Sequence, residues 1–417
     1  MNRILSKALS AALPLAFCCG IAQADEVADE YHGYFRTGAG SSTAGGSQSC
    51  FGLGGNTMRY RLGNECDTYL ELQYTKEMMK VEGVSFVGHV MTNGYSPNSI
   101  GDLKLELAKL YVEAKGIPEL NGGTAWIGKR YYVRPDIHML DLQYINLNGT
   151  GAGIDGIKAG PGRFSYALFK DNDTNVTDPV TGRVVNSNAA MRHNLVYQGL
   201  PTNQHGSLDA VVSLIKAEGT SGVHNGWQAS LFHNQEKVFG GTNTVGIQYG
   251  VGPGTGIGGQ CCNRIGRSGF TSQGSDVTRL RVFDSLWIQP TPKFGAQFVA
   301  LVQRDKSDAA GGATTWTTVG VRPVYAISQH IKLQAELGID RVKEPTGPAK
   351  RLTKITLAPT IAAGPGVWSR PELRAFVTYG KWNDAATASV NASNEGGPVY
   401  GNRTSATSYG FQVETWF

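Results

Sequence analysis

An alternation of apolar and polar residues with a period of two is the feature that most restricts what this chain can fold into. From residue 331 to 339 every odd position is apolar, and the even positions from 332 to 340 hold Lys, Gln, Glu, Gly and Asp. Such a segment predicts a strand with one apolar and one polar face. Similar segments occur at 68–75, 410–417, 31–38, 280–289, 294–303, 318–325 and 354–360. The alternation therefore predicts an all-β protein.

Two β architectures contain strands of this kind, a soluble sandwich and a transmembrane antiparallel barrel. The strands here are separated by connections rich in Gly, Asn, Ser and Pro, and strands of about ten residues joined in this way are typical of outer-membrane barrels. Only 17% of the residues are charged, against about 25% in ordinary soluble domains. A strand face that meets lipid explains this deficit. We therefore predict the barrel, with long extracellular loops and short periplasmic turns.

The length of the chain predicts the number of strands. At roughly 22 residues for each strand and its connection, the residues after position 24 form about 18 strands, and 16 strands are the alternative. A barrel of that width leaves an aqueous channel. The polar faces of the strands would then line water, and the apolar faces would meet lipid.

The first 24 residues have the organisation of a secretory signal peptide. Arg3 and Lys7 precede an apolar run, and residues 22–24 (Ala-Gln-Ala) form a small-x-small cleavage site. A transmembrane helix is the alternative interpretation, but the run is short and contains Pro14. We expect cleavage after residue 24, which leaves 25–417 as a single barrel domain of the bacterial outer membrane.

The composition and the motifs argue against several classes of function. The chain has 38 Lys+Arg and 33 Asp+Glu, which gives a formal charge of +5. This positive charge is too small for a nucleic-acid binder. The segments 151–156 and 254–259 match G-x-G-x-x-G, but neither lies between a strand and a helix, so both are interpreted as glycine-rich loops. The sequence contains no nucleophile elbow, no P-loop and no spacing typical of a zinc site. We predict no enzymatic activity, no cofactor and no metal.

Four cysteines follow the predicted signal peptide: Cys50, Cys66, Cys261 and Cys262. Four cysteines permit three pairings. The adjacent pair at 261 and 262 cannot easily reach two distant partners, so we favour a Cys50–Cys66 bridge, which would contribute about 3 kcal/mol. The sequence indicates no role for Cys261 and Cys262.

Strand parity predicts that large aromatic residues share the inner face with charged residues. The four pairs are Tyr34 with Arg36, Tyr69 with Glu71, Trp368 with Arg370, and Trp416 with Glu414. The position of Trp368 rests on extending the parity of 373–379 backwards along the chain. Aromatic rings on a water-filled wall suit sugars, whose C–H faces stack on rings while their hydroxyls bond to charged groups. The alternative is that each ring belongs to an interfacial girdle.

Seven segments of the chain form a recognisable series. They are HGYFRTG (32–38), YRLGNECDTYLE (60–71), WIGKRYYVRPDIHMLD (126–141), GTGAG (149–153), TVGVRPVY (318–325), WSRPELRAFVTYGKW (368–382) and ETWF (414–417). In order and spacing the series resembles the maltoporin (sugar porin) family, whereas about 157–275 matches poorly. The resemblance implies an 18-stranded barrel, a homotrimer in the outer membrane, passive uptake of maltodextrins, and the Cys50–Cys66 bridge.

The resemblance also implies roles for single residues. An aromatic slide for sugars would consist of Tyr34, Tyr69, Trp368 and Trp416. A polar track and constriction would consist of Arg36, Arg61, Glu71, Arg134, Asp136, Asp141 and Gln143, the last in place of a family tyrosine. The mid-barrel phenylalanine of the family has no clear match around 239–245. For the aromatic donated by a neighbouring subunit, Tyr95 is a weak candidate. These departures leave the preferred sugar open.

The predicted function is facilitated diffusion of maltose, maltodextrins or related oligosaccharides across the outer membrane. A porin for another carbohydrate and a general diffusion porin are alternatives. A carbohydrate-active enzyme, in the outer membrane or secreted, is an alternative of a different class. It would need a converging Ser/His/acid set or a pair of carboxylates, for which Glu71 and Glu414 could be considered. The segment from Arg134 to Asp141, with His138, is interpreted as a charged constriction loop and not as an acid/base site.

Overall fold

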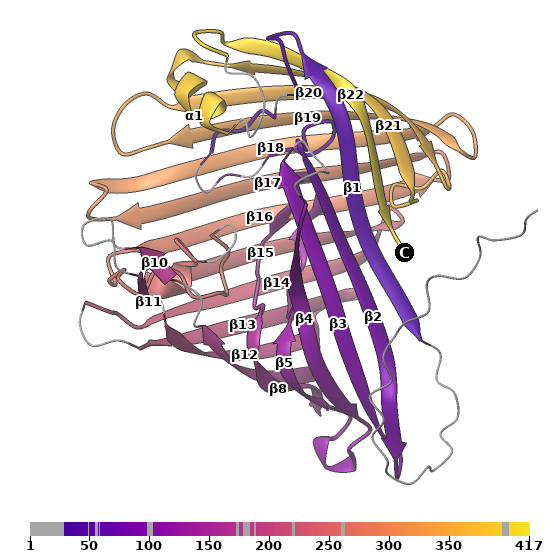
Figure 1. Cartoon of the computed structure of the whole chain (residues 1–417), viewed down its shortest axis with the longest axis vertical. Coiled ribbons are helices and arrows are strands. Elements are labelled where there is room, and N and C mark those ends of the chain that lie inside the picture. The colour runs from indigo at the N-terminus through magenta and orange to yellow at the C-terminus, as the bar shows by residue number, and fades with distance from the viewer. Residues whose placement is uncertain are drawn as a thin grey trace, which may run out of the picture.

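A closed antiparallel barrel of 18 strands is the architecture of this chain (Figure 1). The computed structural model describes residues 29–48, 50–54, 57, 59–97, 103–171, 175–177, 184–186, 189–218, 222–259, 263–393 and 400–417. Strand β1 (Glu30–Ser42) pairs with both β2 (Asp67–Val81) and β22 (Ser405–Trp416), which closes the barrel. The predicted 18 strands are confirmed, and the alternative of 16 is wrong. The predicted signal peptide, Cys261 and Cys262 lie outside the described residues.

The remaining strands and helices follow in chain order. The other wall strands are β3 (Val84–Pro97), β4 (Lys104–Lys115), β5 (Thr124–Arg130), β8 (Gly149–Ala159), β9 (Gly162–Asp171), β12 (Ala190–Pro201), β13 (Gly206–Ala217), β14 (Gly226–Val238), β15 (Gly241–Val251), β16 (Thr278–Thr291), β17 (Phe294–Ser307), β18 (Gly312–Ala326), β19 (Ile331–Lys343), β20 (Lys350–Ala362) and β21 (Glu372–Trp382). The connections contain β6 (Asp136–Ile137), β7 (Leu142–Gln143), β10 (Asn175–Thr177), β11 (Val184–Asn186), η1 (Pro118–Leu120), η2 (His138–Leu140), η3 (Gly252–Thr255), η4 (Asp384–Ala386) and α1 (Thr387–Ala392). Among the described residues, no helix is long and apolar enough to cross a membrane.

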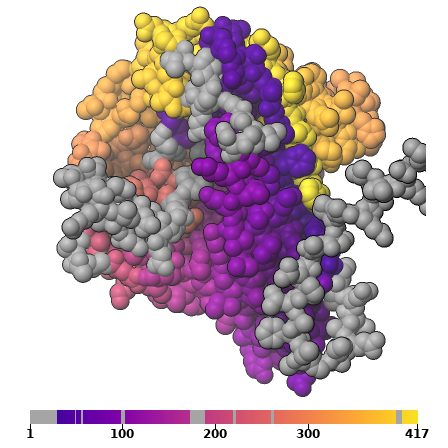
Figure 2. Space-filling model, in the orientation of Figure 1, coloured from indigo at the N-terminus to yellow at the C-terminus, as the bar shows by residue number. Residues whose placement is uncertain are grey.

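The two faces of the strands differ as the alternation predicts. On β19 the side chains of Ile331, Leu333, Leu337 and Ile339 are exposed on the outer face. Those of Lys332, Gln334, Glu336 and Asp340 are buried inside the barrel. A side-chain period of two places successive residues on opposite faces of a strand. Figure 2 shows the outer surface over β2, β3 and β4 as a continuous wall.

Among the described residues, parts of three long connections at one end of the barrel fold into its interior. These parts lie within 43–66, 131–148 and 252–277, and they contain fully buried apolar side chains such as Leu62, Leu147 and Ile265. Connections at the other end are mostly short turns, such as those between β8 and β9 and between β14 and β15. The interior is thus filled in part by these connections.

Cations of the barrel wall hold the inward connections in place. Lys354 Nζ donates to the carbonyl oxygens of Tyr60 (2.6 Å) and Leu62 (3.0 Å), and Arg281 Nη1 donates to that of Tyr144 (3.0 Å). Both cations are at most 2% exposed. The expectation that the polar faces line water is therefore wrong for much of the wall, because their charged groups bond to the backbone of connections that alternation within strands does not describe.

A pair of glycines makes room for one of these connections. Gly320 on β18 and Gly338 on β19 are direct cross-strand partners, and the ring of Tyr60 packs against both. The Tyr60 hydroxyl lies 2.7 Å from that of Thr318. Glycine in a strand often marks the close approach of another segment. Here it lets the connection 43–66 lie flat on the inner wall.

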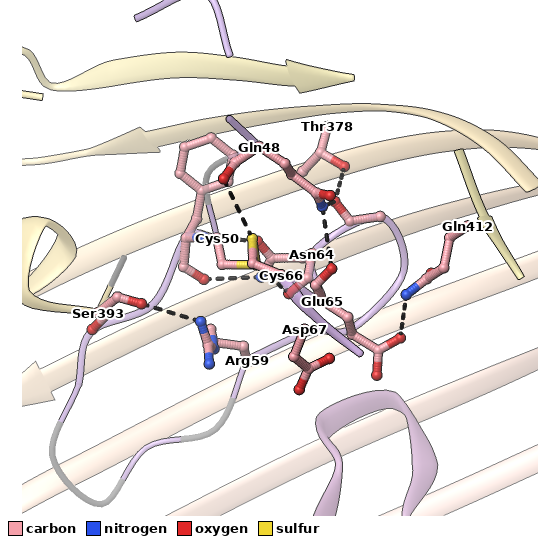
Figure 3. Close-up of a disulfide and its surroundings, with 12 residues drawn as sticks. Gln48, Cys50, Arg59, Asn64, Glu65, Cys66, Asp67, Thr378, Ser393 and Gln412 are labelled. Atoms are coloured by element: carbon pink, nitrogen blue, oxygen red, sulfur yellow. Dashed lines mark hydrogen bonds between the residues drawn. A yellow bond between two sulfur atoms is a disulfide. The ribbon is translucent and has the colours of Figure 1, made fainter. Parts of the chain in front are cut away.

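The Cys50–Cys66 disulfide closes most of the same connection, as predicted (Figure 3). Asn64 lies inside this loop, where its Oδ1 accepts from Phe51 N (2.7 Å) and its Nδ2 donates to Phe51 O (2.9 Å). The bridge and the Asn64 side chain hold the ends of the loop side by side, while Gln412 of β22 donates to the neighbouring Glu65 (2.9 Å).

Candidate functional site

An aromatic row crosses adjacent strands on the inner wall. Tyr34 on β1 and Tyr69 on β2 have ring centroids 6.0 Å apart. Tyr34 is also the direct cross-strand partner of Trp416 on β22, and directly paired residues lie on the same face of a sheet. The Trp416 ring lies 6.4 Å from that of Trp368. The structure therefore brings together the four aromatic residues that the sequence assigned to the interior.

Trp368 reaches this row from a turn and not from a strand. Strand β20 ends at Ala362 and β21 begins at Glu372, so alternation along β21 does not extend to Trp368. The turn bonds to two strands of the barrel wall. Val367 N donates to Gln289 Oε1 of β16 (2.9 Å), and Lys332 Nζ of β19 donates to the carbonyl of Gly366 (2.9 Å). The predicted position of Trp368 inside the barrel is right, but its predicted cause is wrong.

A charged cluster centred on Glu414 holds the row in place. Glu414 is fully buried and forms ion pairs with Arg61 (2.8 Å), Arg370 (3.1 Å) and Arg374. The Tyr34 hydroxyl donates to Glu414 Oε1 (3.1 Å) and accepts from Arg61 Nη2 (2.6 Å). Charge-assisted bonds are stronger and more directional than neutral ones. The cluster therefore fixes the Tyr34 ring.

Arg36 links this cluster to the constriction loop. Its guanidinium pairs with Asp67 (2.8 Å), Glu65 (3.3 Å) and Asp141 (3.4 Å). Burial alone would raise the pKa of the Asp141 carboxyl, but Arg36 and Arg61 outweigh it and hold that pKa below its usual value. Asp141 is therefore a carboxylate that ties the loop to β1.

The constriction loop is a small hairpin inside the barrel. Asp136 pairs in register with Gln143, and η2 carries His138 at the tip between them. Arg61 Nη1 lies 3.1 Å from His138 Nδ1. Burial and the positive charge of Arg61 hold the pKa of His138 well below its usual value, so the ring is neutral at physiological pH. The Gln143 side-chain oxygen accepts from Asn146 Nδ2 (2.5 Å).

Glu71 and Arg134 form a second charged pair beside Tyr69. Arg134 Nη2 lies 3.3 Å from Glu71 Oε1, which also accepts from the Tyr69 hydroxyl (2.6 Å). The Arg134 guanidinium lies 3.8 Å from the centre of the Tyr131 ring. Glu71 thus bonds to Arg134 and Tyr69, and Glu414 bonds to three arginines and to Tyr34. Neither carboxylate has the apolar surroundings that keep a catalytic acid protonated.

Trp287 of β16 is a lumenal aromatic that the sequence analysis missed. Its ring lies 5.9 Å from that of Trp368. The signal was available, because Arg279 and Arg281 share its parity on a strand that alternates less cleanly. His138 was assigned only to the charged loop, but its ring lies 5.1 Å from Trp368 and 6.1 Å from Trp416.

The sequence departs from the family pattern at two further places, the aromatic donated by a neighbouring subunit and the mid-barrel phenylalanine. Tyr95 is the direct cross-strand partner of Tyr69, so both lie on the same face of the sheet, and its contact with a neighbouring subunit stays a prediction. In the region 239–245, Phe239 lies on a turn and is 72% exposed, while Thr242 pairs directly with Trp287. Within the described part of the chain, no group of three or more His, Cys, Asp or Glu residues could hold a metal ion.

Comparison with known proteins gives a family match and similarities to solved porin structures at low sequence identity. The family model described as LamB porin matches residues 30–417. The structure of OmpF from Salmonella typhi, in complex with daunomycin, has a TM-score of 0.51 and 8% identity, and the match covers 93% of this chain and 97% of that chain. An anion-selective porin from Comamonas acidovorans has a TM-score of 0.45 and 13% identity, covering 94% and 99%. OccK1 from Pseudomonas aeruginosa has a TM-score of 0.48 and 10% identity, covering 93% and 98%. The likeness to OmpF concerns the fold alone.

Proposed function

Because this chain belongs to the LamB porin family and forms an outer-membrane porin barrel, we propose that maltose, maltodextrins or related oligosaccharides cross it by facilitated diffusion. The observation that carries the proposal is the aromatic row of Tyr69, Tyr34, Trp416 and Trp368 on the inner wall. These rings come from three strands and one turn, so their alignment is a property of the fold.

The chemistry of the row suits a sugar chain. The C–H faces of pyranose rings can stack on the aromatic rings, because both surfaces are flat and apolar. The hydroxyl groups need donors and acceptors at the edge of the row, which Arg36, Glu71 and Asp141 supply. Because many similar contacts follow one another along the row, a sugar can move from one contact to the next without entering a deep free-energy minimum. Movement would then follow the concentration gradient and needs no energy source.

The charged cluster keeps the row rigid during transport. Arg61 and Arg370 both pair with Glu414, and Arg61 and Glu414 both bond to the Tyr34 hydroxyl, so the ring stays in place when a sugar leaves it. Rings of charged side chains also bias the passage of small ions. Charged side chains along the passage would therefore also influence which small ions pass.

The cellular setting is part of the proposal. Resemblance to the family supports a homotrimer, and the leader-like residues 1–24 support export through a cleaved signal peptide. The apolar outer face, with exposed side chains such as Leu72, Leu105 and Val377, supports contact with membrane lipid. The long connections would then face the cell exterior and the short turns the periplasm.

Ion current through the reconstituted channel tests the proposal. In a planar bilayer, we expect millimolar maltohexaose to reduce the potassium chloride current of the wild-type protein reversibly. Trp416→Ala should weaken this block about tenfold, since it removes one stacking surface. Trp227→Ala is a matched control, because Trp227 lies on the outer face and is 42% exposed. A current that no oligosaccharide reduces would contradict the proposal.

A porin for a different sugar is the second candidate, and Gln143 favours it. Its amide replaces a tyrosine of the family and accepts a bond from Asn146, so the constriction offers other polar contacts than a phenol. A panel of maltose, sucrose, raffinose and aryl glucosides in the same experiment separates the two candidates. Stronger block by a sugar other than maltodextrin would assign the channel to that sugar. Recovery of cleaved sugar would instead point to the enzymatic alternative.

A further inference from the structure

We propose that a band of outward-facing cations on β17 to β21 binds the phosphate groups of a lipid in the outer leaflet of the membrane. The basic band consists of Arg304, Arg341, Arg351 and Lys381, which are all exposed. It lies on the outside of the wall, apart from the aromatic row and the constriction loop. This role is separate from sugar transport and takes only the orientation of the barrel from the proposed function.

Strand parity places the basic band on the outer face. On β19, Arg341 follows Ile339 by two positions, and on β21, Lys381 follows Tyr379 by two positions. Both Ile339 (44% exposed) and Tyr379 (42% exposed) face outward. Residues two apart on a strand share a face. The same relation holds for Arg304 with Val302 and for Arg351 with Ile355.

The centre of the band is a pair of like charges. Arg341 of β19 and Arg351 of β20 are direct cross-strand partners, so their Cβ atoms stand about 5 Å apart. Like charges in this position destabilise a sheet. The adjacent Lys350 pairs with Glu344 (2.8 Å), but neither guanidinium of the pair has a carboxylate partner among the described residues. A phosphate between them would remove the repulsion and accept bidentate bonds from arginine.

The other two cations extend the charge on both sides of this pair. Arg304 lies opposite Thr315 of β18, the strand that separates β17 from β19 in the sheet (Figure 1). Lys381 lies opposite Thr353, two residues beyond Arg351. Since neighbouring strands are about 4.8 Å apart, Arg304 is about 10 Å from the pair across the sheet. The band therefore offers two separate positions for phosphate, with threonine hydroxyls between them.

The outer face of these five strands is charged at one end only. The basic band lies beside the turns 308–311 and 344–349, at the same end as the long inward connections. Between the band and the short turns, the outer face of β17 to β21 carries no charged residue. Cations confined to one end indicate that one leaflet holds the anionic groups. In the proposed orientation, that leaflet is the outer one.

The residues next to the band suit the acyl chains of the same lipid. Toward the short turns, the next outward positions are Val302, Val319, Ile339 and Ile355, which are between 44% and 51% exposed. A lipid can therefore place its phosphates on the cations and its chains on this apolar surface. A soluble anion would use the cations alone. The combination is what favours a lipid as the occupant.

Binding of diphosphoryl lipid A to the purified protein in a non-ionic detergent, followed by native mass spectrometry, tests the band. We expect Arg341→Gln/Arg351→Gln to weaken binding about tenfold to thirtyfold, because two cations near the phosphates are lost. Arg341→Lys/Arg351→Lys should retain part of the affinity, since lysine keeps the charge but not the bidentate contact. Lys80→Gln/Lys158→Gln, at exposed positions near the short turns, changes the net charge equally and should bind like wild type.

The temperature of unfolding gives a second, independent measurement. Without lipid, Arg351→Gln should be at least as stable as wild type, because it removes a like-charge contact. With lipid A, the wild type should gain stability, since a ligand of the native state stabilises it, and the variant should gain less. A variant that is less stable without lipid and binds lipid A as wild type does would assign Arg351 a structural role and overturn the proposal.

The remaining outcomes also decide the matter. Equal affinity of the wild type and Arg341→Gln/Arg351→Gln for lipid A would overturn the proposal. Inorganic phosphate that competes with lipid A at equal concentration would overturn it too, because the site would then be one for a free anion. Loss of the trimer in this variant with lipid affinity unchanged would assign the band to a subunit contact instead. Sugar block of the ion current should be the same in every variant, so this proposal and the proposed function can fail separately.

Discussion

At the scale of single residues, Glu414 forms more ion pairs in the charged cluster than any one of its partners does. It is fully buried and balances three arginines, Arg61, Arg370 and Arg374. Parity predicted that Glu414 faces inward with Trp416, and the structure agrees. Parity could not predict that Arg61 would arrive there, because Arg61 lies on a connection that has no alternation. The partners of an ionised group are decided by segments that are remote in sequence.

We predict that Glu414→Gln destabilises the barrel by about 3–5 kcal/mol, because it leaves buried arginines without a compensating charge. The temperature of unfolding in detergent, followed by circular dichroism, should fall accordingly. Glu119→Gln, at an exposed position on a turn, is the matched control and should stay within about 0.5 kcal/mol of wild type. Equal stability of Glu414→Gln and wild type would mean that water or ions compensate the arginines.

His138 predicts a dependence of stability on pH. Burial and Arg61 hold its pKa well below the usual value, while unfolding returns the ring to a pKa of about 6.5. Below that pH the unfolded chain binds a proton that the folded chain does not, so stability falls as the solution is acidified. The loss is at most about 1.4 kcal/mol for each pH unit.

The measurement compares unfolding temperatures of wild type and His138→Gln between pH 7.5 and pH 5.5. We expect the wild type to lose more stability over this range than the variant, because glutamine does not titrate. An identical decline in the two proteins would show that His138 is protonated in the folded barrel or that other groups dominate.

At the scale of elements, the strands were predictable and the connections were not. The exposed outer residues of β19 and the buried inner residues of β21 follow directly from a period of two. The turn between β20 and β21 does not, although it supplies Trp368 and Arg370 to the site. Its course depends on Val367 and Gly366, which bond to β16 and β19. No local pattern encodes bonds between segments so far apart.

The glycine pair on β18 and β19 leads to a prediction at this scale. Gly338→Ala would place a methyl group against the Tyr60 ring and should destabilise the barrel by about 1–3 kcal/mol through overpacking. Ala335→Val adds carbon atoms on the opposite face of the same strand and is the control. Unfolding temperatures of both variants give the comparison. A Gly338→Ala barrel as stable as the control would show that the connection 43–66 can move off the wall without cost.

At the scale of the whole molecule, the barrel is wider than its passage. Three inward connections occupy part of the interior, and wall cations such as Lys354 and Arg281 bond to their backbone. Inner polar residues therefore have two tasks, since some face the passage and others hold the connections. This division explains why the low charge content of the chain still leaves a dense charged cluster at the constriction.

The sequence by itself determined the fold class, the number of strands, the disulfide and the inward side of Tyr34, Tyr69 and Trp416. Each of these depends on local alternation, chain length, cysteine positions or a motif series, all of which are readable along the chain. Only the tertiary structure decided that Trp287 meets Trp368, that Arg61 reaches Glu414, and which inner residues face water. These contacts join segments separated by tens to hundreds of residues, and their geometry follows from closing the barrel and folding its connections inward.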